Sequence, residues 1–194
     1  GNTIVGYDAG SDSNHSQATA VGYQAGKAVT STGAVNIGYQ SGVALTSGSG
    51  NTSVGYLSLK SLTTGSGNTA IGNKALEAAL TDGSDIAHNN TCVGSQAGWK
   101  ITYGTANTCI GETNSTALTT GDYNIIIGAN MNTATADGNN RIALGYNFQA
   151  STNDTLEFGK ASNVATSSAF ASSGGCTFAY SSDERKKRNI EDNT

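Results

Sequence analysis

Side chains that could perform chemistry are few in this 194-residue chain, and the carboxylates are the first to consider. Five of them are spread thinly over the second half: Glu112, Asp122, Asp137, Asp154 and Glu157. A glycan-cleaving enzyme needs two carboxylates held close together. The sequence marks no such pair, although one could form between chains. We therefore interpret these five residues as solvated surface.

Side chains suited to ligand binding gather around a short insertion near residues 82–88. The candidate contact residues are Asp85, His88, Trp99 and Tyr103. An insertion in a repeat protein leaves the stack as a loop, often on the binding face. The alternative, a tolerated loop without a ligand, has equal support.

Bulk composition excludes several classes of function. The chain has 26 glycines, no proline and only 12% charged residues, with a net charge of −4. The few basic residues before residue 182 are scattered, so we expect no nucleic-acid partner. Apolar runs are too short for membrane insertion. We see no signal peptide at the N-terminus, which begins directly in the repeat described next.

The elements that position these residues form a repeat. Nine times an aliphatic residue precedes a glycine, at Gly6, Gly22, Gly38, Gly55, Gly72, Gly94, Gly111, Gly128 and Gly145. The intervals are 16, 16, 17, 17, 22, 17, 17 and 17 residues. Such a period is typical of stacked units, and disorder has no reason to produce it. We predict an all-β fold, a β-solenoid or β-roll of nine units of roughly 17 residues.

The residues around each glycine predict a short strand. Position −1 is Val, Ile or Leu, position −3 is mostly Thr, and the two share a face by the period of two. Position −2 is mostly small. We expect the −1 and −3 rows to face the core. A second apolar row predicts a second strand in each coil: Leu45, Leu62, Leu80, Ile101 and Leu118.

Three further rows recur at fixed offsets. Asparagine at position −4 predicts a turn ladder, whose side chains can also bond to one another along the axis. Threonine at −3 raises the alternative of a flat ice-binding face, but Val35 and Ile125 interrupt that row as in a core. Tyrosine after the glycine could bind sugar rings, or, as we favour, pack at a corner or between protomers. The tyrosines are Tyr7, Tyr23, Tyr39, Tyr56 and Tyr146.

The three cysteines show no metal-ligand spacing, and we expect no metal and no cofactor. Cys92 and Cys109 occupy the same repeat position, so they should lie one coil apart, a spacing that permits a disulfide. Free thiols that fill the small-residue row are the alternative. Cys176 lies outside the array.

So little apolar mass should leave a seam and exposed edges. Threefold association would cover them, and we expect a homotrimer.

The N-T-x-[IV]-G-Y-x-A-G units resemble repeat arrays in bacteriophage tail fibres. They resemble more loosely the heads of bacterial trimeric autotransporter adhesins, in which a shorter unit builds a trimeric β-roll. This resemblance covers residues 1 to about 150 and does not separate the two families.

The C-terminus favours the phage family. The run from Ser182 to Ile190 resembles the start of the intramolecular chaperone auto-processing domain of tail spikes and fibres, S-D-E-R-x-K-x-N-I. The resemblance implies self-cleavage between Ser182 and Asp183, with Ser182 as nucleophile and Lys187 as general base. Burial and neighbouring cations would depress the pKa of such a lysine. The family commonly has an apolar residue where Lys186 stands.

A chaperone domain needs on the order of a hundred residues, and a dozen follow the expected cut. We therefore expect no enzyme activity and an intact Ser182–Asp183 bond, in a truncated chain or a fibre separated from its chaperone. The expected domains are the array (1–150), an irregular β-rich neck (151–182) and the start of the chaperone domain (183–194).

The resemblance implies the shaft of a tail fibre in the virion, made in the host cytoplasm, where free thiols are favoured. The expected partners are a host cell-surface glycan or outer-membrane receptor and other tail proteins. The alternatives are an adhesin head and, third, a polysaccharide-degrading tail spike.

Overall fold

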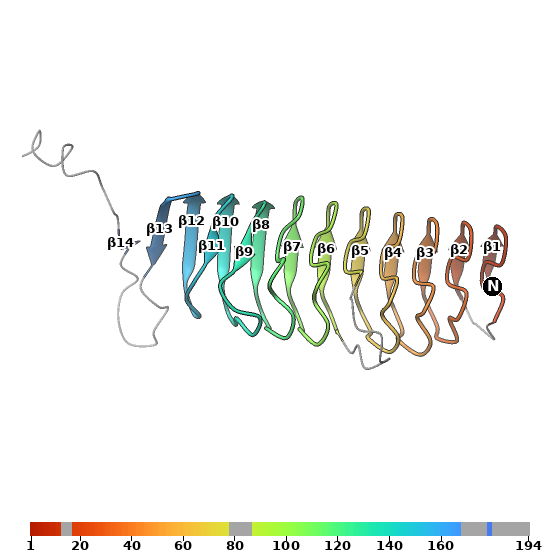
Figure 1. The fold of residues 1–194 in the computed structure, drawn as a ribbon. Helices are drawn as coiled ribbons and strands as arrows, with labels where there is room; N and C mark the ends of the chain where they lie inside the picture. The colour runs from red at the N-terminus through yellow and green to blue at the C-terminus, as the bar shows by residue number, and fades with distance from the viewer. Residues whose placement is uncertain (13–16, 78–86, 168–177, 180–194) are drawn as a thin grey trace, which may run out of the picture.

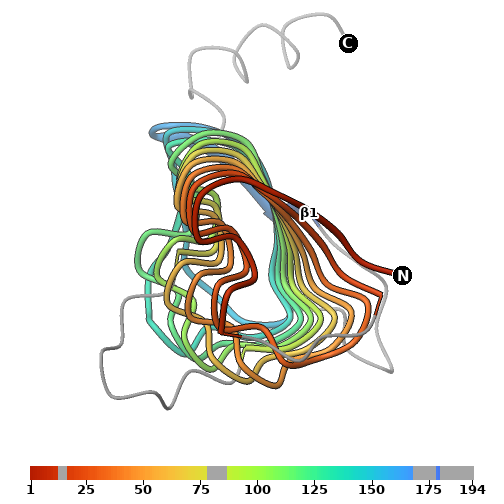
Figure 2. The same ribbon diagram turned by 90° about the vertical axis from the view of Figure 1, so that its right-hand side faces the viewer.

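The computed structural model describes residues 1–12, 17–77, 87–167 and 178–179. They form a stack of coils along one axis, an all-β solenoid as predicted (Figures 1 and 2). The strands of the first seven coils are β1 (Thr3–Val5), β2 (Thr19–Val21), β3 (Val35–Ile37), β4 (Thr52–Val54), β5 (Thr69–Ile71), β6 (Thr91–Val93) and β7 (Thr108–Ile110). The later strands are β8 (Ile125–Ala129), β9 (Asn132–Thr133), β10 (Ile142–Tyr146), β11 (Gln149–Ala150), β12 (Leu156–Lys160), β13 (Asn163–Ser167) and β14 (Phe178–Ala179).

One twelve-stranded sheet forms a wall of the solenoid, with the order β1 to β8, then β10, β12, β13 and β14. From β1 to β12 all its pairs are parallel, and each strand pairs with its counterpart one coil on. The parallel stack continues past the ninth repeat glycine, because Gly145 pairs with Gly159. Strands β13 and β14 then pair antiparallel. On another wall, β9 and β11 form a two-stranded parallel sheet.

The glycine after each strand permits this close stacking. Gly94 has a φ of 129°, which side chains rarely adopt, and a Cβ there would overlap the carbonyl of Gly111 in the next coil. The same contact recurs from coil to coil, so the regular aliphatic-glycine pair marks the point where one backbone rests on the next.

The predicted orientation of the strands is wrong. Cys92 and Cys109, at position −2, are fully buried, whereas Ile71 and Ile110, at position −1, are 40% and 37% exposed. The coil is narrow, so its strand wall admits mostly small side chains on the inner face. β-branched residues suit either face of a strand, and a period of two cannot tell the inner face from the outer. The aliphatic and threonine rows therefore form the outer face of the sheet.

The predicted second strand is also wrong for the first seven coils, whose described residues form one strand each. The row that suggested it is nevertheless in the core. Leu45, Leu62, Ile101 and Leu118 are all fully buried, on turns or irregular backbone opposite the sheet. Leu80 lies outside the described residues.

A ladder of asparagines runs through the interior, and this prediction is confirmed. In four successive coils the Nδ2 group donates to the Oδ1 atom of the asparagine one coil earlier, at 2.9–3.2 Å. Its members are fully buried: Asn51, Asn68, Asn90, Asn107 and Asn124. Asn107 shows the pattern in full, because Nδ2 also donates to the Gly121 carbonyl at 2.8 Å and Oδ1 accepts the Asn124 N–H at 3.0 Å. The ladder thus satisfies the buried backbone of the corner.

We predict that Asn107→Ala lowers the free energy of unfolding by about 2–4 kcal/mol, because the Gly121 carbonyl and the Asn124 N–H lose a buried partner. Denaturant unfolding followed by circular dichroism measures the change. The matched control is Asn73→Ala, at an exposed asparagine, which should cost less than about 0.5 kcal/mol. Equal effects of the two substitutions would show that the ladder does not stabilise the fold.

Candidate functional site

Three residues of the predicted contact site, His88, Trp99 and Tyr103, lie within the described part of the chain, and each has its own surroundings there. His88 pairs with Thr105 in the stack, and its Nδ1 accepts the Ser66 N–H at 3.0 Å. Trp99 is half-buried beneath Lys100, whose Nζ lies 4.8 Å from the ring centroid, and Tyr103 is 37% exposed. Within the described part of the chain, no hydrogen bond or ring contact joins these three residues. Asp85 lies outside that part, as do Ser182, Asp183 and Lys187.

His88 belongs instead to a second hydrogen-bonded ladder at a corner of the coil. A backbone N–H in one coil donates to the side chain at the equivalent position in the next. Thr105 donates to Asp122 at 2.6 Å, and Asp122 donates to Asn139 at 2.6 Å. His88 accepts the Ser66 N–H in the same way. The Nδ1 atom of His88 therefore takes part in a hydrogen bond between coils.

The prediction that the five dispersed carboxylates are solvated surface is wrong for Glu157, which is buried, and Asp122 and Asp154 accept hydrogen bonds within the stack. Asp122 caps Thr105, and Asp154 accepts from Asn140 Nδ2 at 2.9 Å. Glu157 is 2% exposed and accepts the backbone N–H groups of Ser151 and Thr152. Bound in this way, they are poorly placed to act as a general acid and base. No cluster of three or more metal-ligating side chains occurs among the described residues.

Arg141 is a buried residue that the sequence reasoning missed. It follows Asn124 in the asparagine row, and its N–H donates to Asn124 Oδ1 at 3.1 Å. The guanidinium donates to Asn153, Ala150 and Thr135. Burial lowers the pKa of Arg141, while the charge of Glu157 opposes that shift. Arg141 therefore ends the ladder as a satisfied cation.

A half-buried ion pair joins the first two coils. Lys27 Nζ lies 2.9 Å from Asp8 Oδ2. Hydrogen bonds from Lys27, Ser11 and Gln24 lower the pKa of Asp8 to about 2, and Asp8 in turn raises the pKa of Lys27. Asp8 and Lys27 neutralise each other across two coils. We therefore interpret the pair as a structural contact rather than a reactive centre.

The tyrosine row forms a stack on the outside. Tyr7, Tyr23, Tyr39 and Tyr56 lie with ring centroids 5.1–5.5 Å apart and nearly parallel. All four are 40% or more exposed. Because each ring covers the face of its neighbour, the row offers mainly edges and hydroxyls. Sugar rings stack on open aromatic faces, so the row is a poor sugar platform. Tyr146, also exposed, stands apart from it.

A continuous apolar row runs along the outer face of the main sheet. Its most exposed members are Val5, Ile37, Ile71, Ile110, Ile127, Leu144 and Phe158, each 37% exposed or more. In-register pairing places them one above another, about 4.8 Å apart. The threonine row runs beside them, two residues earlier in each strand and so about 6.6 Å away along the strand. The outer face of the main sheet is therefore a regular surface of parallel aliphatic and threonine rows.

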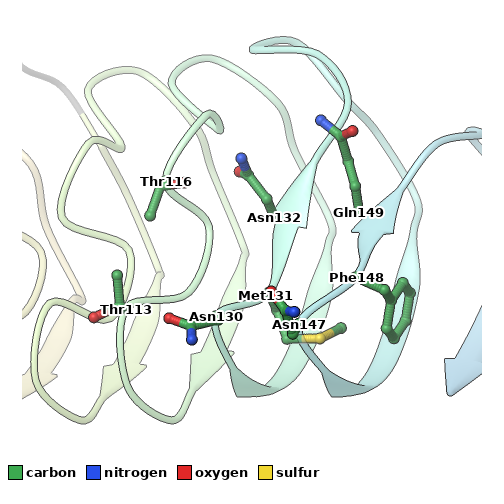
Figure 3. A pocket seen from close by; sticks show the side chains of 8 residues that line it. All are labelled: Thr113, Thr116, Asn130, Met131, Asn132, Asn147, Phe148 and Gln149. Atoms are coloured by element: carbon green, nitrogen blue, oxygen red, sulfur yellow. The ribbon is translucent and has the colours of Figure 1, made fainter. Parts of the chain in front are cut away.

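A polar groove opens where the coil changes shape (Figure 3). Its volume is about 440 Å³. Thr113, Asn130 and Asn147 follow one line along the axis, and Thr116, Asn132 and Gln149 follow a second. Sequence reasoning missed the groove. The available signal was the replacement of the Ala-Gly pair of earlier turns, as in Ala97-Gly98, by Met131-Asn132 and Phe148-Gln149.

Cys92 and Cys109 are register partners on the inner face of β6 and β7, and both thiols are free. A hydrogen bond with Cys109, together with burial, raises the pKa of the Cys92 thiol. The Sγ atom of Cys109 lies 3.0 Å from Ser115 Oγ. The pair fills the small-residue row rather than forming a reactive site.

We predict that neither thiol reacts with a water-soluble disulfide reagent while the chain is folded, because the −2 row points inward. In a Cys176→Ser variant, absorbance should record no released thiolate in the folded state and two per chain in denaturant. Rapid reaction of either thiol in the folded chain would place the −2 row outside and overturn the assigned orientation.

Comparisons with family models, with curated proteins and with solved structures found no match to this chain. Among the described residues, no helix is long or apolar enough to cross a membrane.

Proposed function

We propose that this chain is a segment of a bacteriophage tail fibre that serves as a rigid shaft and presents a host-receptor-binding surface. Three copies pack through the outer face of the main sheet. The observation that carries this proposal is the exposed aliphatic row, which extends along the whole parallel stack.

Parallel sheets are normally covered on both faces. Here the inner face packs on the core, while the outer face exposes isoleucine, leucine and phenylalanine. A contiguous apolar surface of this kind is typical of an interaction site. Burying the remaining exposed part of each aliphatic side chain would contribute on the order of 0.5–1 kcal/mol. The contributions add along the stack because the same residue type recurs in every coil.

The width of the row supports three copies. Each coil presents one aliphatic side chain, flanked by the threonine row on one side and the glycine on the other. Three such rows can converge on a common axis and exclude water while the threonines stay at the margin. Two sheets packed face to face would bury the threonine row as well. A trimer of parallel solenoids would also be stiff, as a shaft requires.

The phage assignment rests on the resemblance of the run from Ser182 to Ile190 to a chaperone junction. An adhesin head would use the same exposed face, so the solenoid itself does not separate the two families. A chaperone domain downstream in the gene would support the tail fibre, whereas a membrane-anchoring domain there would support the adhesin.

A second candidate function follows from the corrected orientation of the strands. An ice-binding face needs its threonine row outside the core. The threonine and aliphatic rows lie on the outer face of the sheet and so meet this requirement. Thr52, Thr69, Thr91 and Thr108 lie in register on the outer face beside the aliphatic row. A single uncovered copy would present this regular array to water.

We predict that light scattering after size exclusion gives three times the chain mass of 19.5 kDa. The double substitution Ile71→Lys and Ile110→Lys should yield monomers that keep the β-sheet circular dichroism, because charges at the centre of the interface cannot be desolvated. The control Thr120→Lys, exposed on a different wall, should remain trimeric.

A wild-type chain that is monomeric at all concentrations would contradict the trimer. If that monomer shows thermal hysteresis, and if Thr91→Lys abolishes it, the outer face of the main sheet binds ice.

A further inference from the structure

The polar groove of the last coils is built by a change in the core. Met131 and Phe148 occupy the position held by a buried alanine in earlier coils, such as Ala97. These larger side chains need more room, and the turn that follows opens into β9 and β11. The wall therefore steps at the junction with the coil of Thr113 and Thr116, and the groove lies at this step (Figure 3).

The backbone around the groove is already paired. Asn130 donates its N–H to the Glu112 carbonyl, Asn132 to Phe148 and Asn147 to Ala129. An extended peptide that binds by adding a strand needs unpaired N–H and C=O groups at a sheet edge. Such groups are taken here, so side chains must carry any recognition.

The side-chain amides of the groove are in part unused. Asn130 and Asn147 are exposed, one coil apart, and none of their side-chain atoms has a hydrogen-bond partner among the described residues. Asn132 Oδ1 accepts the N–H groups of Ala117 and Thr133, which leaves its amino group free to donate. The groove thus offers donors and acceptors in two rows.

No charged side chain lines the groove. An anionic ligand would find no cation, and a cationic ligand no carboxylate. Each amide offers both a donor and an acceptor, as a sugar hydroxyl does. Two rows that advance by about 4.8 Å per coil suit a chain of repeating polyhydroxylated units.

We propose that this groove binds a neutral oligosaccharide, with the amides of Asn130 and Asn147 as its principal contacts. The inference rests on the proposed function only for the source of the sugar, the host cell surface. The groove is shallow, so one copy binds weakly. Three copies in a trimer carry three grooves, and simultaneous engagement strengthens attachment without any new contact.

The test uses the full chain on a printed array of neutral bacterial surface glycans, with acidic glycans of similar length beside them. Asn130→Asp and Asn147→Asp keep a residue that tolerates the positive φ of 51–52° at these sites, but they replace the amide donor with a charge. Each should lower the signal on neutral glycans at least ten-fold. The matched control is Asn89→Asp, an exposed asparagine at φ 55° outside the groove, which should leave the signal unchanged.

Absence of binding to every neutral glycan would overturn the proposal, as would binding that survives both groove substitutions. Stronger binding to acidic glycans would also contradict it. Mass measurements on the same samples separate this outcome from failure of the fibre proposal. A trimer that binds no glycan would contradict only the proposal that the groove binds sugar. A monomer that binds neutral glycans would contradict only the proposal of a trimeric shaft.

Discussion

Parallel stacking in register is the constraint on which the rest of this structure depends. Each coil places every residue above its counterpart, so a group that lacks a partner within its coil must find one in the next coil. The asparagine ladder meets this requirement in the interior, where the amide of Asn107 connects Asn90, Gly121 and Asn124. The repeat glycine meets it at the strand exit, where a side chain would overlap the next coil. The ladder asparagine and the repeat glycine recur along the chain because each coil contacts only its neighbours, so one unsuitable residue would interrupt the stack.

The same constraint explains the surfaces. A coil of about 17 residues encloses a narrow core that small side chains and a few rows of larger aliphatic residues can fill, so the aliphatic residue before each glycine is left outside. The outer aliphatic row therefore remains exposed, and the in-register pairing of the strands aligns its side chains along the axis. Where larger core residues enter, at Met131 and Phe148, the coil opens and the uniform wall gives way to a groove. One change in core volume thus accounts for the groove.

Sequence reasoning could predict the solenoid, the asparagine ladder and the alignment of Cys92 with Cys109, because each depends on spacing alone. It could not predict which face of the strand points inward, since alternation in a strand has two equivalent orientations and aliphatic residues were assumed to be core. It named His88 as a contact residue from its place near the insertion, but it could not predict that His88 Nδ1 accepts the Ser66 N–H, because that bond depends on the register between coils. The groove escaped notice because its asparagines resemble those of ordinary turns.

Hydrogen exchange of side-chain amides, followed by nuclear magnetic resonance on isotope-labelled protein, tests the central claim most directly. If the ladder lies inside the stack, the Nδ2 protons of Asn68, Asn90 and Asn107 exchange with solvent far more slowly than those of exposed Asn73, and they do so together. Exchange of the ladder amides at the rate of Asn73 would contradict the assigned interior, and with it the orientation of every row described above.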